Sequence, residues 1–394
     1  MNAIATLCLS SAALASTLHA AEQTPKWLED GPYIEGHEIS VELPLEMLAN
    51  MLLVEVQLGG TSRRFLLDTG SVSMMDTHLA QELALEVVDR RQSQDSHGAI
   101  IETDVVQAEL TLGTIPDHPQ GPSVCRRLSE DREMLVRRRA RLGSAASVRV
   151  ADRPARLRAA LQLQRQRARS CQRSQATPLY NFGYPHAPIL DIGLANDATS
   201  KALFDTGSPE YLAISPPDLD GARRNKGVGP TVAGHGSLGG SMGGLAPEKD
   251  QLRVRLNALA IGAMRLGAVD AVLRETPPSL IGAPILEHFV VTLDTRAKSA
   301  WFDAYRDGPL MRPSYGLALA FEDGVSVSLV WDDSPAAAAG LRVGHELTSI
   351  NQRPARATCD GIRSAIRAMS TGNSIQLGWD ENTVTLIRAK LAAQ

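Results

Sequence analysis

Cysteine is scarce in this chain, because its 394 residues include only four. Cys8 lies in an apolar N-terminal run, and Cys125, Cys171 and Cys359 show neither a CxxC spacing nor paired histidines. We therefore expect neither a disulfide framework nor a metal site. An HExxH motif, a Walker loop and a strand-to-helix GxGxxG turn are also lacking, which removes the commonest signatures of metalloproteases and nucleotide-binding proteins. The sequence predicts no bound cofactor.

Long apolar runs are missing as well, except at the N-terminus. Residues 3–20 are uncharged, rich in Ala, Leu and Ser, and followed by a polar segment. This pattern is typical of a cleavable signal peptide, residues 1–21, although a basic residue near Met1 is lacking; the alternative is an incidental apolar N-terminus. No later segment offers the roughly 18 apolar residues of a membrane span. We expect a periplasmic or secreted protein without an integral membrane segment after signal removal.

Residues 121–175 lack lysine and aromatic residues, and they hold 15 arginines against 4 acidic residues. Binding of single-stranded nucleic acid would require aromatic side chains among the positive charges, so we expect no nucleic-acid partner. Two interpretations of residues 119–176 stay open. One is a solvated, partly helical basic linker, and the other is a local reading-frame error that turned a normal segment into an Arg-rich one.

Two stretches of the chain repeat each other. In the first, residues 53–58 alternate in polarity, and the short apolar segment 65–67 leads into Asp-Thr-Gly-Ser at 68–71. In the second, residues 189–194 and 202–204 lead into the same tetrapeptide at 205–208. Alternation and an intervening polar turn predict a β-hairpin before each motif. The spacing is that of a duplicated domain rather than of a solenoid.

The two motifs supply the carboxyl groups of Asp68 and Asp205, which are our candidate catalytic residues. Hydrolysis of a peptide bond without a metal or a covalent intermediate requires one group that activates water and another that protonates or polarises the carbonyl oxygen. Two close carboxyls sharing one proton can do both. Glycine allows the tight turn that brings backbone N–H groups near a carboxylate, and threonine hydroxyls can tie two loops together. The expected supporting residues are Thr69, Gly70, Ser71, Thr206, Gly207 and Ser208.

Two apolar residues followed by Asp-Thr-Gly-Ser resemble the active-site signature of the retropepsin-like and pepsin-like aspartic proteases. The resemblance implies a mainly β fold of two β-barrel lobes, residues 38–118 and 177–306. It also implies a second apolar-apolar-Gly element beneath each Asp loop, which residues 280–282 match through Ile281 and Gly282. In the first lobe the corresponding Leu142-Gly143 follows a run of arginines, so this lobe is expected to be incomplete.

The same resemblance implies a flap that covers the substrate in each lobe. The Gly-rich segment 234–244 stands at that place in the second lobe, and residues 96–99 are the weaker counterpart in the first. Residues 239–243 also match the GxSxG pattern of serine hydrolases, but the glycines around them do not fit a strand followed by a helix. The flap residues that we expect are His97, Gly98, Gly236, Ser237 and Leu238.

The C-terminal residues 309–394 resemble a small α+β PDZ domain. Segments 315–319 (YGLAL) and 334–347 (SPAAAAGLRVGHEL) follow the order of that family, and an amphipathic segment at 361–369 precedes two further strands. The resemblance implies that an extended peptide adds to the edge of one strand, with backbone N–H groups receiving its terminal carboxylate. That strand would contain Gly316, Leu317, Ala318 and Leu319. The alternative is a unit that only packs against the second lobe.

Together these features predict an aspartic endopeptidase that acts on protein or peptide substrates and recruits them through its PDZ-like domain. Two alternatives stay open. Each lobe could pair with its twin in another chain as a homodimer, as in retropepsins with a single motif. Alternatively, the chain could be a non-catalytic exported peptide-binding protein with a degenerate protease lobe.

Overall fold

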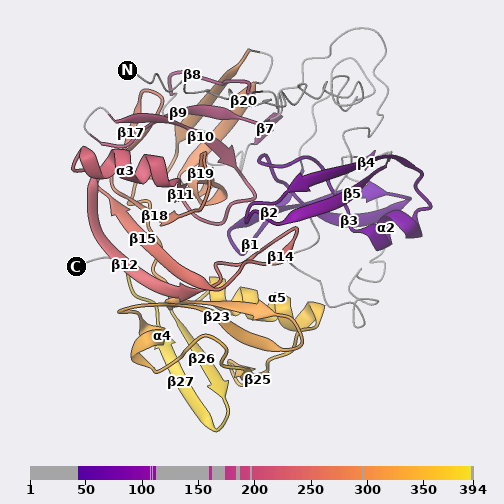
Figure 1. The fold of residues 1–394 in the computed structure, drawn as a ribbon, viewed down its shortest axis with the longest axis vertical. Coiled ribbons are helices and arrows are strands. Elements are labelled where there is room, and N and C mark those ends of the chain that lie inside the picture. The colour runs from indigo at the N-terminus through magenta and orange to yellow at the C-terminus, as the bar shows by residue number, and fades with distance from the viewer. Residues whose placement is uncertain are drawn as a thin grey trace, which may run out of the picture.

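The computed structural model describes residues 43–106, 108, 110–111, 159–161, 174–182, 187–195, 198–294 and 297–391. The prediction of a mainly β chain is confirmed, because strands far outnumber helices in this part of the chain. We call residues 43–111 the N-terminal unit, 174–312 the central unit and 313–391 the C-terminal unit (Figure 1). The expected signal peptide 1–21, Leu142-Gly143 and most of residues 119–176 lie outside the described residues. Within those residues, no helix is both long and apolar enough to cross a membrane.

The N-terminal unit is built on a hairpin whose side chains alternate between core and surface. Leu52, Val54, Val56 and Leu58 are buried on one face of β2, as a two-residue period requires. Gly59 and Gly60 close the hairpin with φ of 60° and 73°, the backbone of a two-residue turn that favours glycine. The elements are β1 (Leu45–Leu48), β2 (Met51–Leu58), β3 (Thr61–Leu66), α2 (Thr77–Glu82), β4 (Val87–Gln94), β5 (Ile100–Val106) and β6 (Leu110–Thr111).

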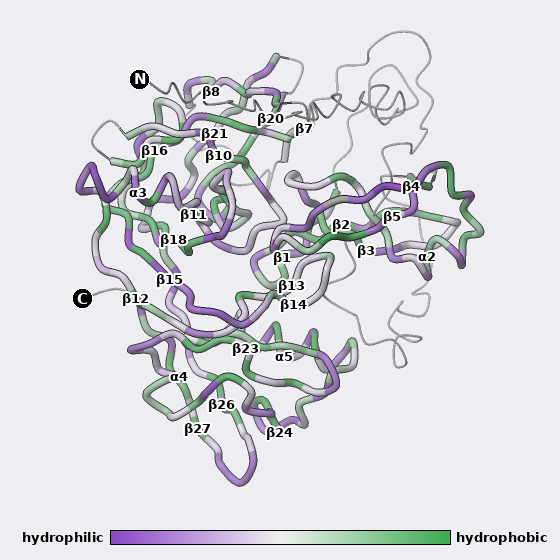
Figure 2. Tube along the Cα trace, viewed as in Figure 1, coloured by the Kyte–Doolittle hydropathy of each residue, from purple (hydrophilic) through white to green (hydrophobic). Residues whose placement is uncertain are grey.

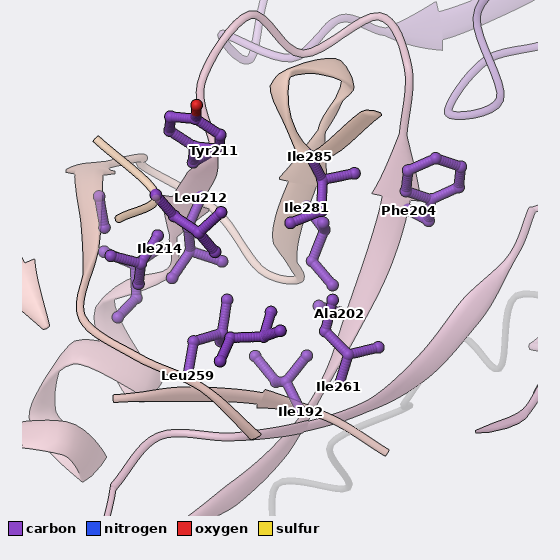
Figure 3. Close-up of a cluster of buried hydrophobic side chains, with 14 of the residues drawn as sticks. Ile192, Ala202, Phe204, Tyr211, Leu212, Ile214, Leu259, Ile261, Ile281 and Ile285 are labelled. Carbon is purple, nitrogen blue, oxygen red and sulfur yellow. The ribbon is translucent and has the colours of Figure 1, made fainter. Parts of the chain in front are cut away.

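The central unit holds the main hydrophobic core. Several of its strands are mostly hydrophobic (Figure 2), and their buried side chains converge in one cluster (Figure 3). Leu52 of β2 is fully buried in the same cluster, so the N-terminal unit contributes to this core. The elements are β8 (Thr177–Pro178), β9 (Ile189–Gly193), β10 (Thr199–Asp205), β11 (Leu212–Ile214), α3 (Pro216–Arg224), β12 (Val228–Gly236), β13 (Gly240–Ser241), β14 (Gly244–Leu245), β15 (Lys249–Leu256), β16 (Leu259–Ile261), β17 (Met264–Leu266), β18 (Val269–Leu273), β19 (Ser279–Gly282), η3 (Ala283–Glu287), β20 (Phe289–Asp294) and β21 (Ser299–Ala304).

A short strand lies inside the segment that was expected to be a linker or an out-of-frame stretch. β7 (Ala159–Leu161) pairs antiparallel with β20, in a sheet of order β7-β20-β21-β8. Near the end of the same segment, the Ser174 N–H donates to Asp303 Oδ1 at 2.7 Å, and the Ser174 hydroxyl accepts from the Phe302 N–H at 2.9 Å. Pairing with β20 therefore attaches β7 to the central unit, and Ser174 is held against β21.

The C-terminal unit has a separate core around Tyr315, Leu377 and Ala336. Its helices begin where the sequence offers capping residues: the Ser334 hydroxyl accepts from Ala337 N–H, and the Thr358 hydroxyl accepts from Gly361 N–H. Such caps satisfy N–H groups that have no partner within the helix. The elements are β22 (Leu317–Phe321), β23 (Val325–Trp331), α4 (Pro335–Ala338), β24 (Leu347–Ile350), β25 (Arg353–Pro354), α5 (Cys359–Ser370), β26 (Ser374–Trp379) and β27 (Asn382–Ile387).

One sheet runs through the central and C-terminal units. Its order is β17-β16-β9-β10-β19-β11-β18-β15-β12-β23-β22, and the junction is the antiparallel pairing of β12 with β23 (Figure 1). Trp331 of β23 is buried there, and a Cβ added to Gly234 of β12 would lie only 2.7 Å from its ring. The Arg253 guanidinium lies 5.0 Å from the same ring. The C-terminal unit is therefore an extension of the central sheet and is not joined by the chain alone.

We expect Trp331→Ala to lower the free energy of unfolding by about 3–5 kcal/mol, because it removes a buried aromatic side chain at this junction. Ile387→Ala is the matched control, since Ile387 lies in the same unit but is 61% exposed, and its effect should stay within about 0.5 kcal/mol. Chemical denaturation followed by circular dichroism measures both. Equal effects of the two substitutions would contradict a packed junction.

Candidate functional site

The two Asp-Thr-Gly-Ser motifs lie at the ends of corresponding strands. Asp205 is the last residue of β10, and Asp68 is the second residue after the end of β3. Apolar residues before each motif anchor the strand, and Phe204 beside Asp205 is fully buried. Both aspartates are half-buried. The strands thus deliver two carboxyl groups to the boundary between the N-terminal and central units.

A reciprocal set of hydrogen bonds ties the two loops together. Thr69 Oγ1 donates to the Phe204 carbonyl at 2.6 Å, and Thr206 Oγ1 donates to the Leu67 carbonyl at the same distance. Each hydroxyl also accepts the backbone N–H of the opposite threonine, at 3.1 Å in both directions. Because the pattern is symmetric, it fixes the loops face to face within a single chain.

Each carboxyl group lies against the glycine of the opposite loop. A Cβ placed on Gly70 would be 2.5 Å from Asp205 Cγ, and one placed on Gly207 would be 2.4 Å from Asp68 Oδ2. Each glycine N–H donates to the aspartate of its own loop, at 2.8 Å from Gly70 and 2.9 Å from Gly207. Only glycine leaves room for this approach, so the motif residues bring the two carboxyls together.

The Asp205 loop rests on β19, which lies between β10 and β11. Gly282 is paired with Asp205 in the parallel register, and Ile281 is fully buried. A Cβ on Gly282 would lie 2.0 Å from the Glu210 carbonyl oxygen and 2.5 Å from that of Ser208. Ser208 is buried and its carbonyl accepts Ala283 N–H at 3.0 Å, so this loop is held from below.

The Asp68 loop has a different support. Among the described residues, β3 pairs with β2 alone, so it has no counterpart of β19 there. Instead, Leu67 packs against the central core, and Asn50 Nδ2 donates to the Pro209 carbonyl at 3.1 Å. Ser71 in this loop is half-buried. The contacts shown for Asp68 and its neighbours therefore come largely from the central unit.

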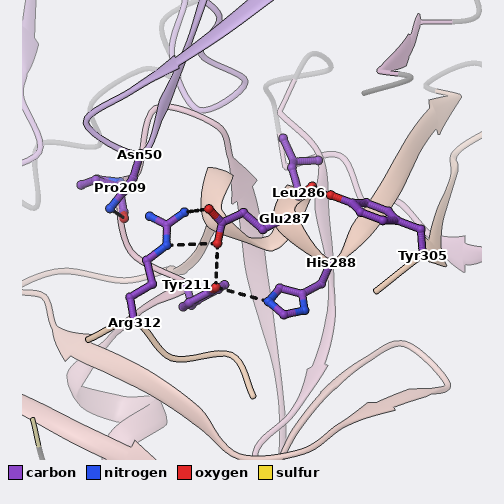
Figure 4. Close-up of polar contacts among 8 residues, drawn as sticks. All are labelled: Asn50, Pro209, Tyr211, Leu286, Glu287, His288, Tyr305 and Arg312. Carbon is purple, nitrogen blue, oxygen red and sulfur yellow. Dashed lines mark hydrogen bonds and ion pairs between the residues drawn. The ribbon is translucent and has the colours of Figure 1, made fainter. Parts of the chain in front are cut away.

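A polar cluster is built around Tyr211, three residues after the motif 205–208 (Figure 4). Tyr211 Oη donates to Glu287 Oε2 at 3.0 Å and lies 3.4 Å from His288 Nε2, while Arg312 forms an ion pair with Glu287. Burial raises the pKa of Tyr211, and burial lowers the pKa of His288. Both groups are therefore neutral near pH 7. The cluster joins Arg312, at the end of the central unit, to η3 and to the segment that follows the Asp205 loop.

Arg274 is a charged neighbour of the site that the motifs did not reveal. It follows β18, its N–H donates to the Ile214 carbonyl at 2.9 Å, and its guanidinium donates to the Pro278 carbonyl. Burial lowers the pKa of Arg274, and the negative charge of Asp205 acts in the opposite direction. The guanidinium of Arg274 therefore interacts electrostatically with the carboxylate of Asp205.

The residues expected in the two flaps lie in different surroundings. His97 and Gly98 form the loop between β4 and β5, where their N–H groups donate to Asp95. Gly236, Ser237 and Leu238 instead border the C-terminal unit: Ser237 N–H donates to the Ser328 carbonyl at 2.7 Å, and Leu238 packs beside Trp331. Gly236, Ser237 and Leu238 lie there because β12 pairs with β23, and the spacing of motifs in the sequence does not predict this pairing.

The strand expected to bind peptides, β22, ends the eleven-stranded sheet. Leu317, Ala318 and Leu319 belong to it, and Leu317 is buried. Gly316 precedes it with φ of 82°, and its N–H donates to Ser314 Oγ at 3.0 Å. β23 is the only strand that pairs with β22 among the described residues.

No three His, Cys, Asp or Glu side chains among the described residues are placed to hold a metal ion. No family model matches the chain, and no curated protein matches it. The site therefore has to be interpreted from its own residues.

We expect Thr69→Val and Thr206→Val each to lower the free energy of unfolding by about 1–3 kcal/mol, because each leaves buried backbone groups without a partner. The double variant should cost less than the sum, since both changes break the same network. Thr103→Val is the matched control: its hydroxyl donates to the Arg91 carbonyl at 2.9 Å within one hairpin. Additive effects in a double-mutant cycle would contradict the reciprocal contact.

Proposed function

We propose that this protein is an aspartic endopeptidase whose active site is formed by Asp68 and Asp205. The observation that carries the proposal is the reciprocal threonine contact, which holds both carboxyl groups against the glycines of opposite loops. The resemblance of both motifs to those of retropepsin-like and pepsin-like proteases supports it. The contact occurs within one chain, which favours a site made by one molecule over one made by two.

Two carboxyls this close can perform both halves of peptide hydrolysis. The proposed mechanism requires one carboxyl to be ionised and the other to be protonated. The ionised carboxyl accepts a proton from the attacking water, and the protonated one donates to the carbonyl oxygen of the substrate. Thr69, Thr206, Gly70 and Gly207 hold the two groups in register. Ile281 and Gly282 support the loop that carries Asp205.

The C-terminal unit supports a role in substrate recruitment. Its resemblance to a PDZ domain and the position of β22 at the end of a sheet suit addition of an extended peptide strand. Since β23 pairs with β12, such a peptide would extend the sheet that also contains β10 and Asp205. The proposed substrates are extended segments of proteins, and the apolar run at residues 3–20 supports action outside the cytoplasm.

A second candidate is a non-catalytic peptide-binding protein. One observation favours it: among the described residues β3 has a single strand partner, whereas β10 is held on both sides. A less rigid Asp68 loop would weaken catalysis, because activity requires the groups to be held in place. Measurements on Asp68 and Asp205 separate the two functions.

Asp68→Asn and Asp205→Asn should each lower kcat/KM on a denatured protein substrate at least about 10³-fold, because both carboxyls take part in proton transfer. Circular dichroism should show an unchanged fold. The control is Asp220→Asn, since the Asp220 side chain is 61% exposed and pairs with Arg223 on the surface. If the Asp205→Asn variant keeps most of its activity, the two-carboxyl mechanism is wrong. A chain that cleaves nothing but binds peptides would support the second candidate.

Peptide binding can be measured on the inactive Asp205→Asn chain by fluorescence polarisation. A peptide with an apolar last residue and a free carboxylate should bind at least about tenfold more tightly than the same peptide with an amidated end, because backbone N–H groups recognise the carboxylate. The amidated peptide is the matched control. Equal affinity for both would contradict carboxylate recognition, and the C-terminal unit would then be a structural part of the sheet.

A further inference from the structure

The loop between β4 and β5 contains a carboxylate that reaches the central unit. Asp95 Oδ2 accepts the Ser241 hydroxyl at 2.5 Å and the Gly243 N–H at 2.9 Å. Both donors belong to the β13–β14 hairpin, and Ser241 lies 146 residues after Asp95 in the sequence. We call these two contacts the Asp95 bridge. It joins the two units that contribute Asp68 and Asp205, at a place separate from the threonine contact.

The other oxygen of the same carboxylate shapes its own loop. Asp95 Oδ1 accepts the N–H groups of His97 at 2.9 Å and of Ala99 at 2.8 Å. Asp95 N–H donates to the Ala99 carbonyl at 2.9 Å, and Gly98 completes the turn with φ of 86°. One side chain therefore organises the tip of the β4–β5 hairpin and presents its second oxygen to the opposite hairpin.

The receiving hairpin is shaped to fit. Ser241 is fully buried, so its hydroxyl would lose a partner if Asp95 moved away. A Cβ on Gly243 would lie 2.7 Å from the Ala99 Cβ and 2.8 Å from Asp95 Oδ2, so glycine is needed for the close approach. The hairpin itself is tied by antiparallel pairing of Ser241 with Gly244. Donors, acceptor and shape are complementary across the two units.

The electrostatics agree with this geometry. Partial burial acts to raise the pKa of Asp95, but hydrogen bonds from Ser241, Gly243, Ala99 and His97 outweigh it and lower the pKa. The carboxylate is therefore ionised near neutral pH, when its contacts are charge-assisted and stronger than neutral hydrogen bonds. Residues 240–245 contain no titratable side chain that would compete for it.

We propose that Asp95 is a positioning residue for the peptidase site. Its carboxylate holds the β4–β5 and β13–β14 hairpins together, so that both hairpins close over the same bound substrate segment. This inference rests on the proposed function. Asp95 acts through the hairpins and does not take part in proton transfer. A substrate bound between hairpins that stay joined is held more tightly, so loss of the bridge should raise KM and leave the chemical step nearly unchanged.

Hydrogen exchange measured by mass spectrometry on the full chain tests the bridge without any activity. In Asp95→Asn and in Ser241→Ala, peptides covering residues 240–246 should exchange at least about tenfold faster than in the unmodified chain. Ser241→Ala leaves the β4–β5 turn intact, so it separates the bridge from local unfolding of that turn. Asp104→Asn is the matched control, because Asp104 lies on the same hairpin and pairs with Arg90 at 3.0 Å. Unchanged exchange in both variants would overturn the proposal.

Kinetics supply the readout that a purely structural role would not give. For a fluorogenic peptide, both variants should raise KM by about tenfold and keep kcat within about threefold, while Asp104→Asn changes neither. A fall in kcat with unchanged KM would overturn the positioning role. If the unmodified chain cleaves nothing, the proposed function fails, and the exchange of residues 240–246 then decides alone whether Asp95 joins the hairpins.

Discussion

The exchange of hydrogen bonds between Thr69 and Thr206 is the constraint on which the rest of the site depends. These hydrogen bonds join residues 137 positions apart, so that neither loop can move alone without breaking them. Packing reinforces it, because Leu52 of the N-terminal unit is buried in the central core. Two half-buried carboxyls would otherwise separate to be solvated individually. The hydroxyl contacts offset that tendency and keep the two carboxyl groups at the boundary of the two units.

Support for this pair is unequal on its two sides. Asp205 lies at the end of a strand that is paired on both sides, in a sheet that continues through β12 and β23 into the C-terminal unit. Trp331 and Arg253 pack at that junction, and Arg253 lies 3.5 Å from Glu210 in the segment after Asp205. Asp68 depends more on contacts made by the central unit. A peptide bound at β22 would therefore act on the better supported half.

Much of the fold was predictable from local patterns. Alternating residues in 53–58 and 189–194 indicated the strands that precede each motif, and the structure shows β2 and β9 there. The prediction of a mainly β chain is confirmed. The pairing of β12 with β23 was not predicted, since it joins strands from two units whose sequences carry no matching signal. Gly236 and Ser237, two of the residues expected in a flap, therefore border the C-terminal unit.

By itself, the sequence determined the local chemistry: two Asp-Thr-Gly-Ser turns, the apolar strands before them and the glycine at 282 that a crossing strand requires. These features depend on neighbours within a few residues, where backbone geometry restricts the choice of side chain. Only the tertiary structure decided which distant groups meet. In the sequence, Asp95 looks like an ordinary turn residue and Arg274 like an ordinary surface cation. Folding brings Asp95 into hydrogen-bond contact with Ser241, and it brings Arg274 close enough to Asp205 for their charges to interact. Contacts of this kind leave no periodic trace in a single sequence, because each requires one side chain in one place.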